Sequence, residues 1–436
     1  MSEAYGWAHP SRRPYRFGVL VVVCFMIYGS YFAYDSVGAI EDYIMESMSI
    51  GQKDIGLMYS MYSWGAIFTL LLSGFLIDRL GTRRSSLLFA GTVTAGAAIV
   101  SIATEVRLIH VGRFVFGAGS EALIVAQSAI LARWFKGKEL AFAFGAAITI
   151  GRLGTLFSFN TEALLAELMG PRGALWIATA LCGLSMLATG IYAWMDTRAE
   201  RVLHLDDESS ERIRWGEVFQ FNKPYWYLTF LCLCFYSAIF PFTALSTDFF
   251  VDKWGIARVA ESSGSFLARV FNNFLHMFST AGGISSIIIF ASMILAPFAG
   301  QLVDKIGRRA SLMLIGSLLM IPSYLLLGLT HIYPAYPMIF LGAAFVLVPA
   351  AMWPSIPLIV RSERVGTAFG LMTAIQNIGL ALFPLFNGLL RDWTKSYTSS
   401  MLMFASLGVI GFWLAFLLKK ADSKEGGALE KEKVTK

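Results

Sequence analysis

Two residues of opposite charge, Glu121 and Arg152, lie deep inside long apolar runs of the sequence. If both runs are helices, a rise of about 1.5 Å per residue puts Glu121 about 18 Å from Arg133, and Arg152 about 21 Å from Lys138. Both therefore lie near the middle of a hydrocarbon core roughly 30 Å thick. A charge at that depth costs about 2.5 to 3.5 kcal/mol, so it needs a partner, a water-filled cavity or a function. We expect both side chains to face a central cavity.

A carboxylate and a guanidinium together favour a cargo that carries both charges. A monocarboxylate or an organic phosphate would suit Arg152 but would be repelled by an ionised Glu121. A dipeptide has an ammonium and a carboxylate at most about 7 Å apart, and the planar arginine fork can bind both carboxylate oxygens. The alternative is a structural ion pair that joins two helices, and a pair that opens for a zwitterion is compatible with both interpretations.

The composition indicates a membrane protein that can enclose such a cavity. Of 436 residues, 56% are hydrophobic and 15% are charged, whereas soluble domains carry about 25% charged residues. The apolar runs predict spans at residues 17–40, 54–77, 85–104, 108–132, 139–165, 174–195, 225–251, 280–303, 310–330, 336–360, 366–390 and 397–418. The predicted fold class is an all-α membrane protein with twelve transmembrane helices in two pseudo-symmetric six-helix bundles.

The distribution of charge predicts the domains and their orientation. Of the 35 Lys and Arg residues, 25 fall in the two termini and the even-numbered connections, which predicts that both termini are cytoplasmic. The predicted parts are a cytoplasmic N-terminus (1–16), an N-terminal bundle (17–195), a cytoplasmic linker (196–223), a C-terminal bundle (224–418) and a cytoplasmic tail (419–436). The C-terminal bundle includes an amphipathic outer insertion at about 255–279, for which a lid and simple surface packing are the alternatives.

An internal repeat supports the division into two halves. The run Gly74-Phe-Leu-Ile-Asp-Arg-Leu-Gly-Thr-Arg83 recurs 226 residues later as Gly300-Gln-Leu-Val-Asp-Lys-Ile-Gly-Arg-Arg309. Both copies follow the second helix of a half, which is typical of parallel repeats.

This doubled loop in a twelve-span chain resembles the major facilitator superfamily. The resemblance implies that the loop residues latch the two halves on the cytoplasmic side. The gating candidates are Asp78, Arg79, Arg83, Asp304 and Arg309, with Arg113 as a further structural or gating residue.

Several longer motifs resemble the lysosomal dipeptide uniporter branch of that superfamily and its microbial relatives. They include Gly112-Arg-Phe-Val-Phe-Gly-Ala-Gly-Ser-Glu121, Phe240-Pro-Phe242 and Ile375-Gln-Asn-Ile-Gly-Leu380. The resemblance implies that Glu121 holds the peptide amine and Arg152 the peptide carboxylate.

Further residues are candidates for the same cavity. Asn377 is the second-half counterpart of Arg152, and Gln376 lies beside it, although helix–helix hydrogen bonding would explain both. Tyr62, Tyr236 and Trp353 are candidates to line side-chain pockets, with packing as the alternative. Asp35 and Asp248 are expected at solvated outer helix ends.

The expected function is alternating-access transport of dipeptides and other short peptides, as a uniporter. We expect neither a catalytic residue nor a metal site nor a cofactor, because no His-Glu-x-x-His run occurs and all four cysteines lie in apolar runs. The expected partners are the peptide and the lipid bilayer, with no nucleic acid and no glycoprotein accessory subunit, and we expect a monomer. The absence of an Asn-x-Ser/Thr sequon favours a bacterial inner membrane.

Three other functions remain open. A proton-coupled carrier of organic anions would bind its cargo with Arg152 and titrate Glu121. A multipass enzyme would form a product, and a receptor on a carrier fold would bind dipeptide without flux.

Overall fold

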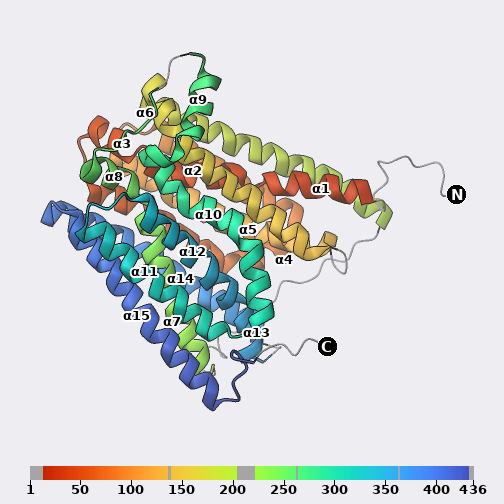
Figure 1. Cartoon of the computed structure of the whole chain (residues 1–436). Helices are drawn as coiled ribbons and strands as arrows, with labels where there is room; N and C mark the ends of the chain where they lie inside the picture. The colour runs from red at the N-terminus through yellow and green to blue at the C-terminus, as the bar shows by residue number, and fades with distance from the viewer. Residues whose placement is uncertain (1–12, 136–138, 204–220, 262–263, 362–363, 432–436) are drawn as a thin grey trace. The chain divides into compact units, whose positions relative to one another are not determined.

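The computed structural model describes residues 13–135, 139–203, 221–261, 264–361 and 364–431. Within these ranges the chain forms helices and connecting turns and no strand (Figure 1). Nine helices in the described ranges are long and apolar enough to cross a membrane, and a shorter apolar stretch covers Ala281–Ala296. The predicted all-α membrane fold is confirmed.

The N-terminal half begins with three short helices and continues with three long ones. The helices are α1 (Arg13–Phe25), α2 (Tyr28–Ala39), α3 (Glu41–Met48), α4 (Gln52–Ile102), α5 (Val106–Phe135) and α6 (Leu140–Leu203). Helices α4 and α6 each hold two of the predicted spans. Each is interrupted by a glycine at a positive φ of 76°, Gly81 in α4 and Gly170 in α6, a conformation that glycine adopts at little cost.

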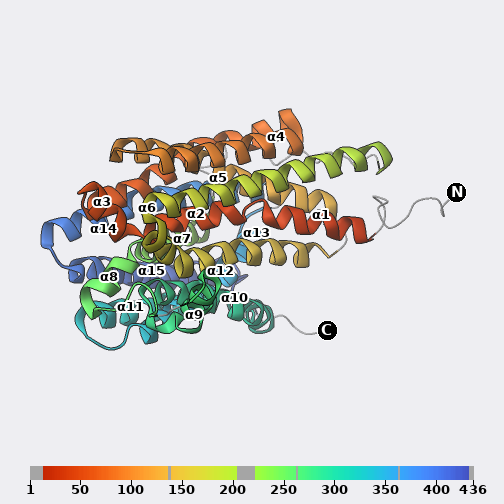
Figure 2. The ribbon, with the colours of Figure 1, turned by 90° about the horizontal axis from the view of Figure 1, so that it is seen from above.

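The C-terminal half continues the same pattern. Its helices are α7 (Lys223–Ala244), α8 (Ser246–Trp254), α9 (Phe266–Leu275), α10 (Ala281–Ile306), α11 (Arg309–Leu329), α12 (Ala335–Met352), α13 (Ile356–Ile359), α14 (Val365–Thr394) and α15 (Tyr397–Lys424). Helix α7 packs against α14 and α15, and α12 packs against α10 and α11. Figure 2 shows these helices from above.

The contacts divide the chain into two units that are not identical with the two halves. The first unit comprises Met1–Ser36, Met61–Ser158 and Leu165–Glu211, and the second comprises Val37–Ser60, Phe159–Leu164 and Arg212–Lys436. Two segments of the N-terminal half, 37–60 and 159–164, thus pack with the C-terminal half. Each unit has its own apolar core, which includes Phe116 in the first and Phe242 in the second.

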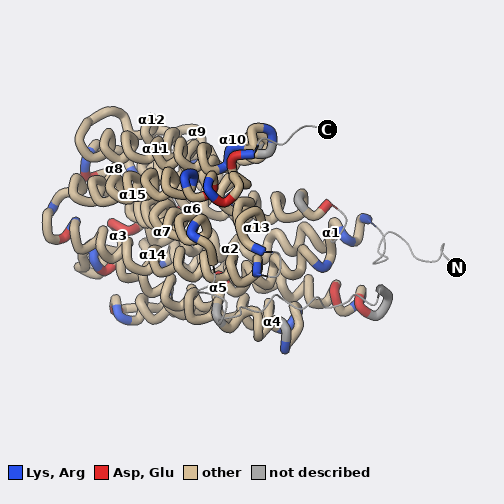
Figure 3. The backbone as a smooth tube through the Cα atoms, turned by 90° about the horizontal axis from the view of Figure 1, so that it is seen from below, with Lys and Arg blue, Asp and Glu red and all other residues tan. Residues whose placement is uncertain are grey.

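The amphipathic helix expected in the insertion is α9. Its exposed side carries Leu267 and Phe271, which are 76% and 65% exposed. On its other side the buried Asn273 donates to the carbonyl oxygen of Asn160 at 3.0 Å. Elsewhere the long helices are uncharged over most of their length, as the tan tube of Figure 3 shows.

Candidate functional site

The carboxylate of Glu121 is held by a tyrosine of the first unit. Glu121 lies on α5 and is half-buried. The hydroxyl of Tyr62, on α4, donates to Glu121 Oε1 at 3.0 Å. Because Tyr62 is only 5% exposed, its ring is fixed by packing and its hydroxyl orients the carboxylate.

A buried arginine supports that tyrosine from behind. Arg113 is 1% exposed, and its guanidinium lies 5.2 Å from the ring centre of Tyr34 and 5.5 Å from that of Tyr62. Its Nη1 donates to the carbonyl oxygens of Ala33 and Tyr34 at 3.4 Å. The rings of Tyr34 and Tyr62 are 4.6 Å apart in an edge-on contact. Arg113 thus joins α2, α4 and α5 around the tyrosine that contacts Glu121.

The expectation that Asp35 is a solvated helix end is wrong. Asp35 is 7% exposed, and its carboxylate accepts a hydrogen bond from Thr155 and lies near Arg113. These partners are distant in sequence, so the helix-length estimate could not reveal them.

Arg152 is half-buried on α6, one turn before Thr155. Tyr31, on α2, lies within electrostatic reach of both Glu121 and Arg152. Two glycines flank Arg152 and let α2 approach: a Cβ at Gly154 would lie 2.5 Å from the carbonyl oxygen of Tyr28, and one at Gly151 would lie 3.0 Å from Ile27 Cδ1. Glu121 and Arg152, the acid and the base that the sequence singles out, therefore both lie near Tyr31 in the first unit.

The four second-half candidates lie in the second unit and form two groups. Trp353 Nε1 donates to the hydroxyl of Tyr236 at 2.9 Å, and the Trp353 ring stacks on Phe369. Asn377 is 2% exposed. Its Nδ2 donates at 3.0 Å to the carbonyl oxygen of Thr373, which lies one helical turn earlier. Gln376 is half-buried, with Cys232 Sγ 3.7 Å from its Oε1.

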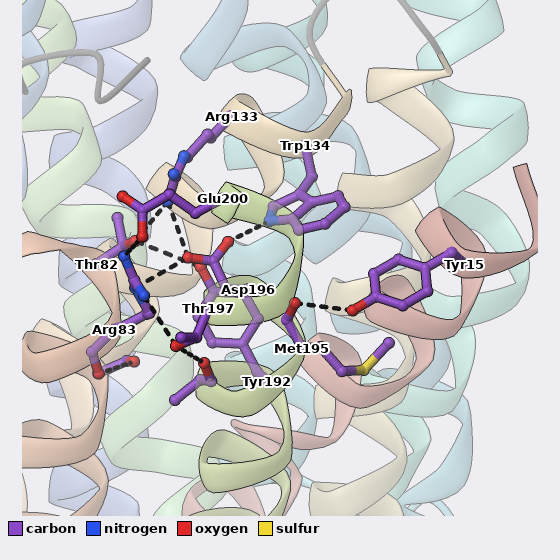
Figure 4. A network of polar contacts seen from close by, with 12 residues as sticks. Tyr15, Thr82, Arg83, Arg133, Trp134, Tyr192, Met195, Asp196, Thr197 and Glu200 are labelled. Atoms are coloured by element: carbon purple, nitrogen blue, oxygen red, sulfur yellow. Dashed lines mark hydrogen bonds and ion pairs between the residues drawn. The ribbon is translucent and has the colours of Figure 1, made fainter. Parts of the chain in front are cut away.

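The first copy of the repeated loop lies in a network of ion pairs within the first unit (Figure 4). Arg83 pairs with Asp196 at 3.2 Å and also with Glu200. Asp196 is fully buried and also pairs with Arg133 at 3.1 Å and accepts from Trp134 Nε1 at 2.9 Å. The sequence did not reveal Asp196, because an acid at the end of a span resembles any solvated helix end.

The other gating candidates have different surroundings. Arg79 is exposed, and the side chains of Asp78 and Asp304 lie outside the described residues. Arg309, in the second copy, is half-buried, and its backbone N–H donates to the carbonyl oxygen of Leu429 at 2.8 Å.

A polar network that the sequence did not predict lies in the second unit, where α3, α4, α8 and α15 begin, and we call these helix ends the outer ends. Glu41, at the start of α3, is fully buried and its Oε1 accepts from the backbone N–H of Asp248 at 2.8 Å. Gln52 Nε2 lies 3.4 Å from Glu41 Oε2 and 3.1 Å from Asp248 Oδ2. The hydroxyl of Tyr397 also donates to Asp248. The expectation of a simple solvated end at Asp248 is therefore wrong.

Known proteins with similar sequences and folds are transporters. The family description Major Facilitator Superfamily matches residues 20–275 and 259–435. The lysosomal dipeptide transporter MFSD1 of Homo sapiens is 32% identical over 438 residues, which cover 96% of this chain and 89% of that protein.

Solved structures agree on the fold. A mutant of the nucleoside transporter NupG has a TM-score of 0.73 at 13% identity and covers 92% of this chain and 99% of its own. A bacterial homologue of the human lysosomal transporter Spinster has a TM-score of 0.71 at 16% identity, and the match covers 95% of this chain and 99% of that one. These relatives are transporters and not enzymes, and the apolar helices make this chain an integral multi-pass membrane protein. The chain belongs to the major facilitator superfamily.

Proposed function

We propose that the protein carries dipeptides and other short peptides across its membrane by alternating access, as a uniporter. Glu121 binds the peptide amine and Arg152 binds the peptide carboxylate. Every short peptide has both end groups, so recognition by them depends little on the side chains of the cargo.

One observation supports this proposal: Glu121 and Arg152 both lie within electrostatic reach of Tyr31, in the same unit. The hydrogen bond from Tyr62 orients the Glu121 carboxylate without supplying a positive charge, so that charge is left for the cargo to supply. A zwitterion satisfies Glu121 and Arg152 together, whereas an anion would leave the half-buried Glu121 carboxylate without a matching charge. Since the zwitterion is neutral overall, its passage requires no accompanying ion.

The relatives support the same cargo. The human relative is named a dipeptide transporter and aligns with 96% of this chain. We propose that Trp353 and Tyr236 line the second-half side of the path with Gln376, whereas the burial of Asn377 favours a role in helix packing. The loop residues Asp78, Arg79, Arg83, Asp304 and Arg309, together with Arg113, are proposed to act in gating.

We propose a monomer in a bacterial inner membrane, with both termini in the cytoplasm. The excess of Lys and Arg in the termini and the even-numbered connections supports this orientation.

The test is uptake of a radiolabelled dipeptide into liposomes that contain the purified protein. Arg152→Ala is expected to lower uptake at least tenfold, and Arg172→Ala, at an exposed position on the same helix, should leave it unchanged. Wild-type uptake by Arg152→Ala would contradict the proposal.

A second comparison tests the amine. The wild-type protein should bind a dipeptide more tightly than its N-acetylated form, and Glu121→Gln should bind the two forms alike. Glu105→Gln, at an exposed position of the connection before α5, is the matched control. Uptake that follows a pH gradient and is competed by lactate or oxalate would instead indicate an organic anion carrier.

A further inference from the structure

Two segments of the N-terminal half make tight backbone contacts with the C-terminal half at the outer ends, within the second unit. A Cβ added at Gly56, near the start of α4, would overlap the carbonyl oxygen of Pro384 on α14. A Cβ added at Gly282, at the start of α10, would likewise overlap the carbonyl oxygen of Phe159 on α6. Nothing larger than hydrogen fits at either position without a shift of the backbone. We call the outer end closed when these two contacts are formed.

Near each contact lies a buried carboxyl group that the transport of a zwitterion does not use. For the first contact this group is Glu41, which is fully buried and bonded to Gln52, one turn before Gly56 on α4. Its hydrogen-bond donors are the backbone N–H of Asp248 and the side-chain amide of Gln52, and both donors are neutral. Burial raises the pKa of Glu41 well above its usual range, and the neighbouring Asp248 and Asp42 carboxylates raise it further.

The cations around Glu41 are engaged with other acids. Arg258 pairs with Asp42. Arg391 pairs with Asp252 at 3.2 Å and lies 4.3 Å from the ring centre of Tyr397. The carboxylate of Asp392 accepts from the backbone N–H groups of Gln52 and Lys53 at 3.2 and 2.8 Å, at the start of α4. Glu41 therefore shares its site with a second carboxylate and has no cation of its own among these residues.

The group near the second contact is Glu162, one turn after Phe159 on α6. Glu162 is fully buried, and neither of its carboxylate oxygens has a hydrogen-bond partner among the described residues. Nearby on α6, Asn160 donates to Ser286 Oγ at 3.1 Å, and its carbonyl oxygen accepts from Asn273 Nδ2 of α9 at 3.0 Å.

The charged groups of the segment around α9 are Arg258, Glu261, Arg269 and His276. Among the described residues none of them makes a hydrogen bond to Glu162. A buried ionised carboxylate without a partner is strongly unfavourable, and such a group becomes neutral instead.

We propose that Glu41 and Glu162 are two proton-binding sites that are filled when the outer end is closed. As each contact forms, a carboxylate oxygen takes a proton from the water of the outer compartment, and as the contact opens the proton returns to that compartment. The proton is thus a ligand of one conformation and is not carried across, so the proposal is compatible with uniport.

The direction of the pH effect follows from this assignment. The neutral carboxyls stabilise the closed contacts at low pH, and this stabilisation is lost as the pH rises and the acids ionise. For each proton that is bound only in the closed state, the ratio of closed to open molecules falls by up to roughly tenfold for every unit by which the pH rises. Two such protons give up to roughly a hundredfold per pH unit.

The experiment measures this ratio without any cargo, so its result is independent of the proposed peptide transport. Spin labels at Ser47→Cys on α3 and Trp393→Cys on α14, both exposed, report the distance across the first contact by double electron–electron resonance in nanodiscs. The four native cysteines are buried. We expect a short distance at pH 5 and a growing population of longer distances towards pH 8.

Substitutions identify the groups that bind the protons. Each single substitution, Glu41→Gln or Glu162→Gln, should weaken the pH dependence of the ratio of closed to open molecules by up to roughly tenfold per pH unit. The double variant should remain closed at pH 8. Glu162→Met, which also cannot titrate and has no amide to bury, serves as a second variant if the glutamine disturbs folding. Glu46→Gln and Glu167→Gln, at exposed positions on the same two helices, should behave like the parent. A parent protein whose distances do not change with pH, or a double variant with the parent's pH dependence, would overturn the proposal.

Discussion

Tyr62→Phe removes two hydrogen bonds from the proposed amine site, one to Glu121 and one with the Ser120 side chain. The hydroxyl of Tyr62 donates to Glu121 Oε1 at 3.0 Å, and a hydrogen bond to a charged group contributes about 1.5 to 3 kcal/mol. The ring contacts with Tyr34 and Phe116, at 4.6 and 5.7 Å between centres, remain available to phenylalanine. If the hydrogen bond holds the carboxylate in position for the amine, affinity should fall roughly tenfold to a hundredfold.

The assay is binding of a dipeptide and of its N-acetylated form, measured by thermal shift and by uptake. Tyr62→Phe should weaken binding of the free dipeptide and leave the acetylated form nearly unaffected, because only the free amine contacts Glu121. Tyr15→Phe is the matched control, since its hydroxyl donates to the carbonyl oxygen of Met195 at 2.8 Å, which is not part of this site. Equal losses for both ligands, or no loss, would refute the role of Tyr62 in orienting Glu121.

Three further substitutions test features of the fold and its conformations. Asp196→Asn should destabilise the protein by about 3 kcal/mol, because it leaves Arg83 and the 6% exposed Arg133 without their shared carboxylate, and a lower melting temperature in detergent would show this. Gly282→Ala should deplete the closed outer end because its Cβ overlaps a backbone carbonyl, and spin-label distances that stay closed would contradict this. Leu429→Ala should lower the free energy of unfolding by about 2 to 3 kcal/mol, because Leu429 is fully buried. A denaturation midpoint equal to that of the parent protein would contradict this.

The helices could be predicted from the sequence because their signal is local. Apolar runs of membrane-spanning length predict a helix wherever they occur, since the hydrocarbon core leaves the backbone no other partner. The same reasoning locates the breaks near Gly81 and Gly170, where polar residues interrupt the apolar runs.

The candidate site could be predicted only in part. Glu121 and Arg152 are conspicuous because charge is rare inside apolar runs. Glu41 is not, because it stands beside Asp42 at the end of an apolar run, where acids are usually solvated. Its burial depends on Asp248, which is 207 residues away in the sequence, and spacing along one helix carries no information about such a contact.

Helix α9 affects how the protein must be handled outside its membrane. Its Leu267 and Phe271 are exposed, whereas Asn273 of the same helix is buried and bonded to Asn160, so this short segment adds apolar surface to that of the long helices. Exposed apolar area of this kind favours association in water by about 25 cal/mol per Å². A detergent or nanodisc that covers only the long helices would leave this segment bare and make the sample prone to aggregate.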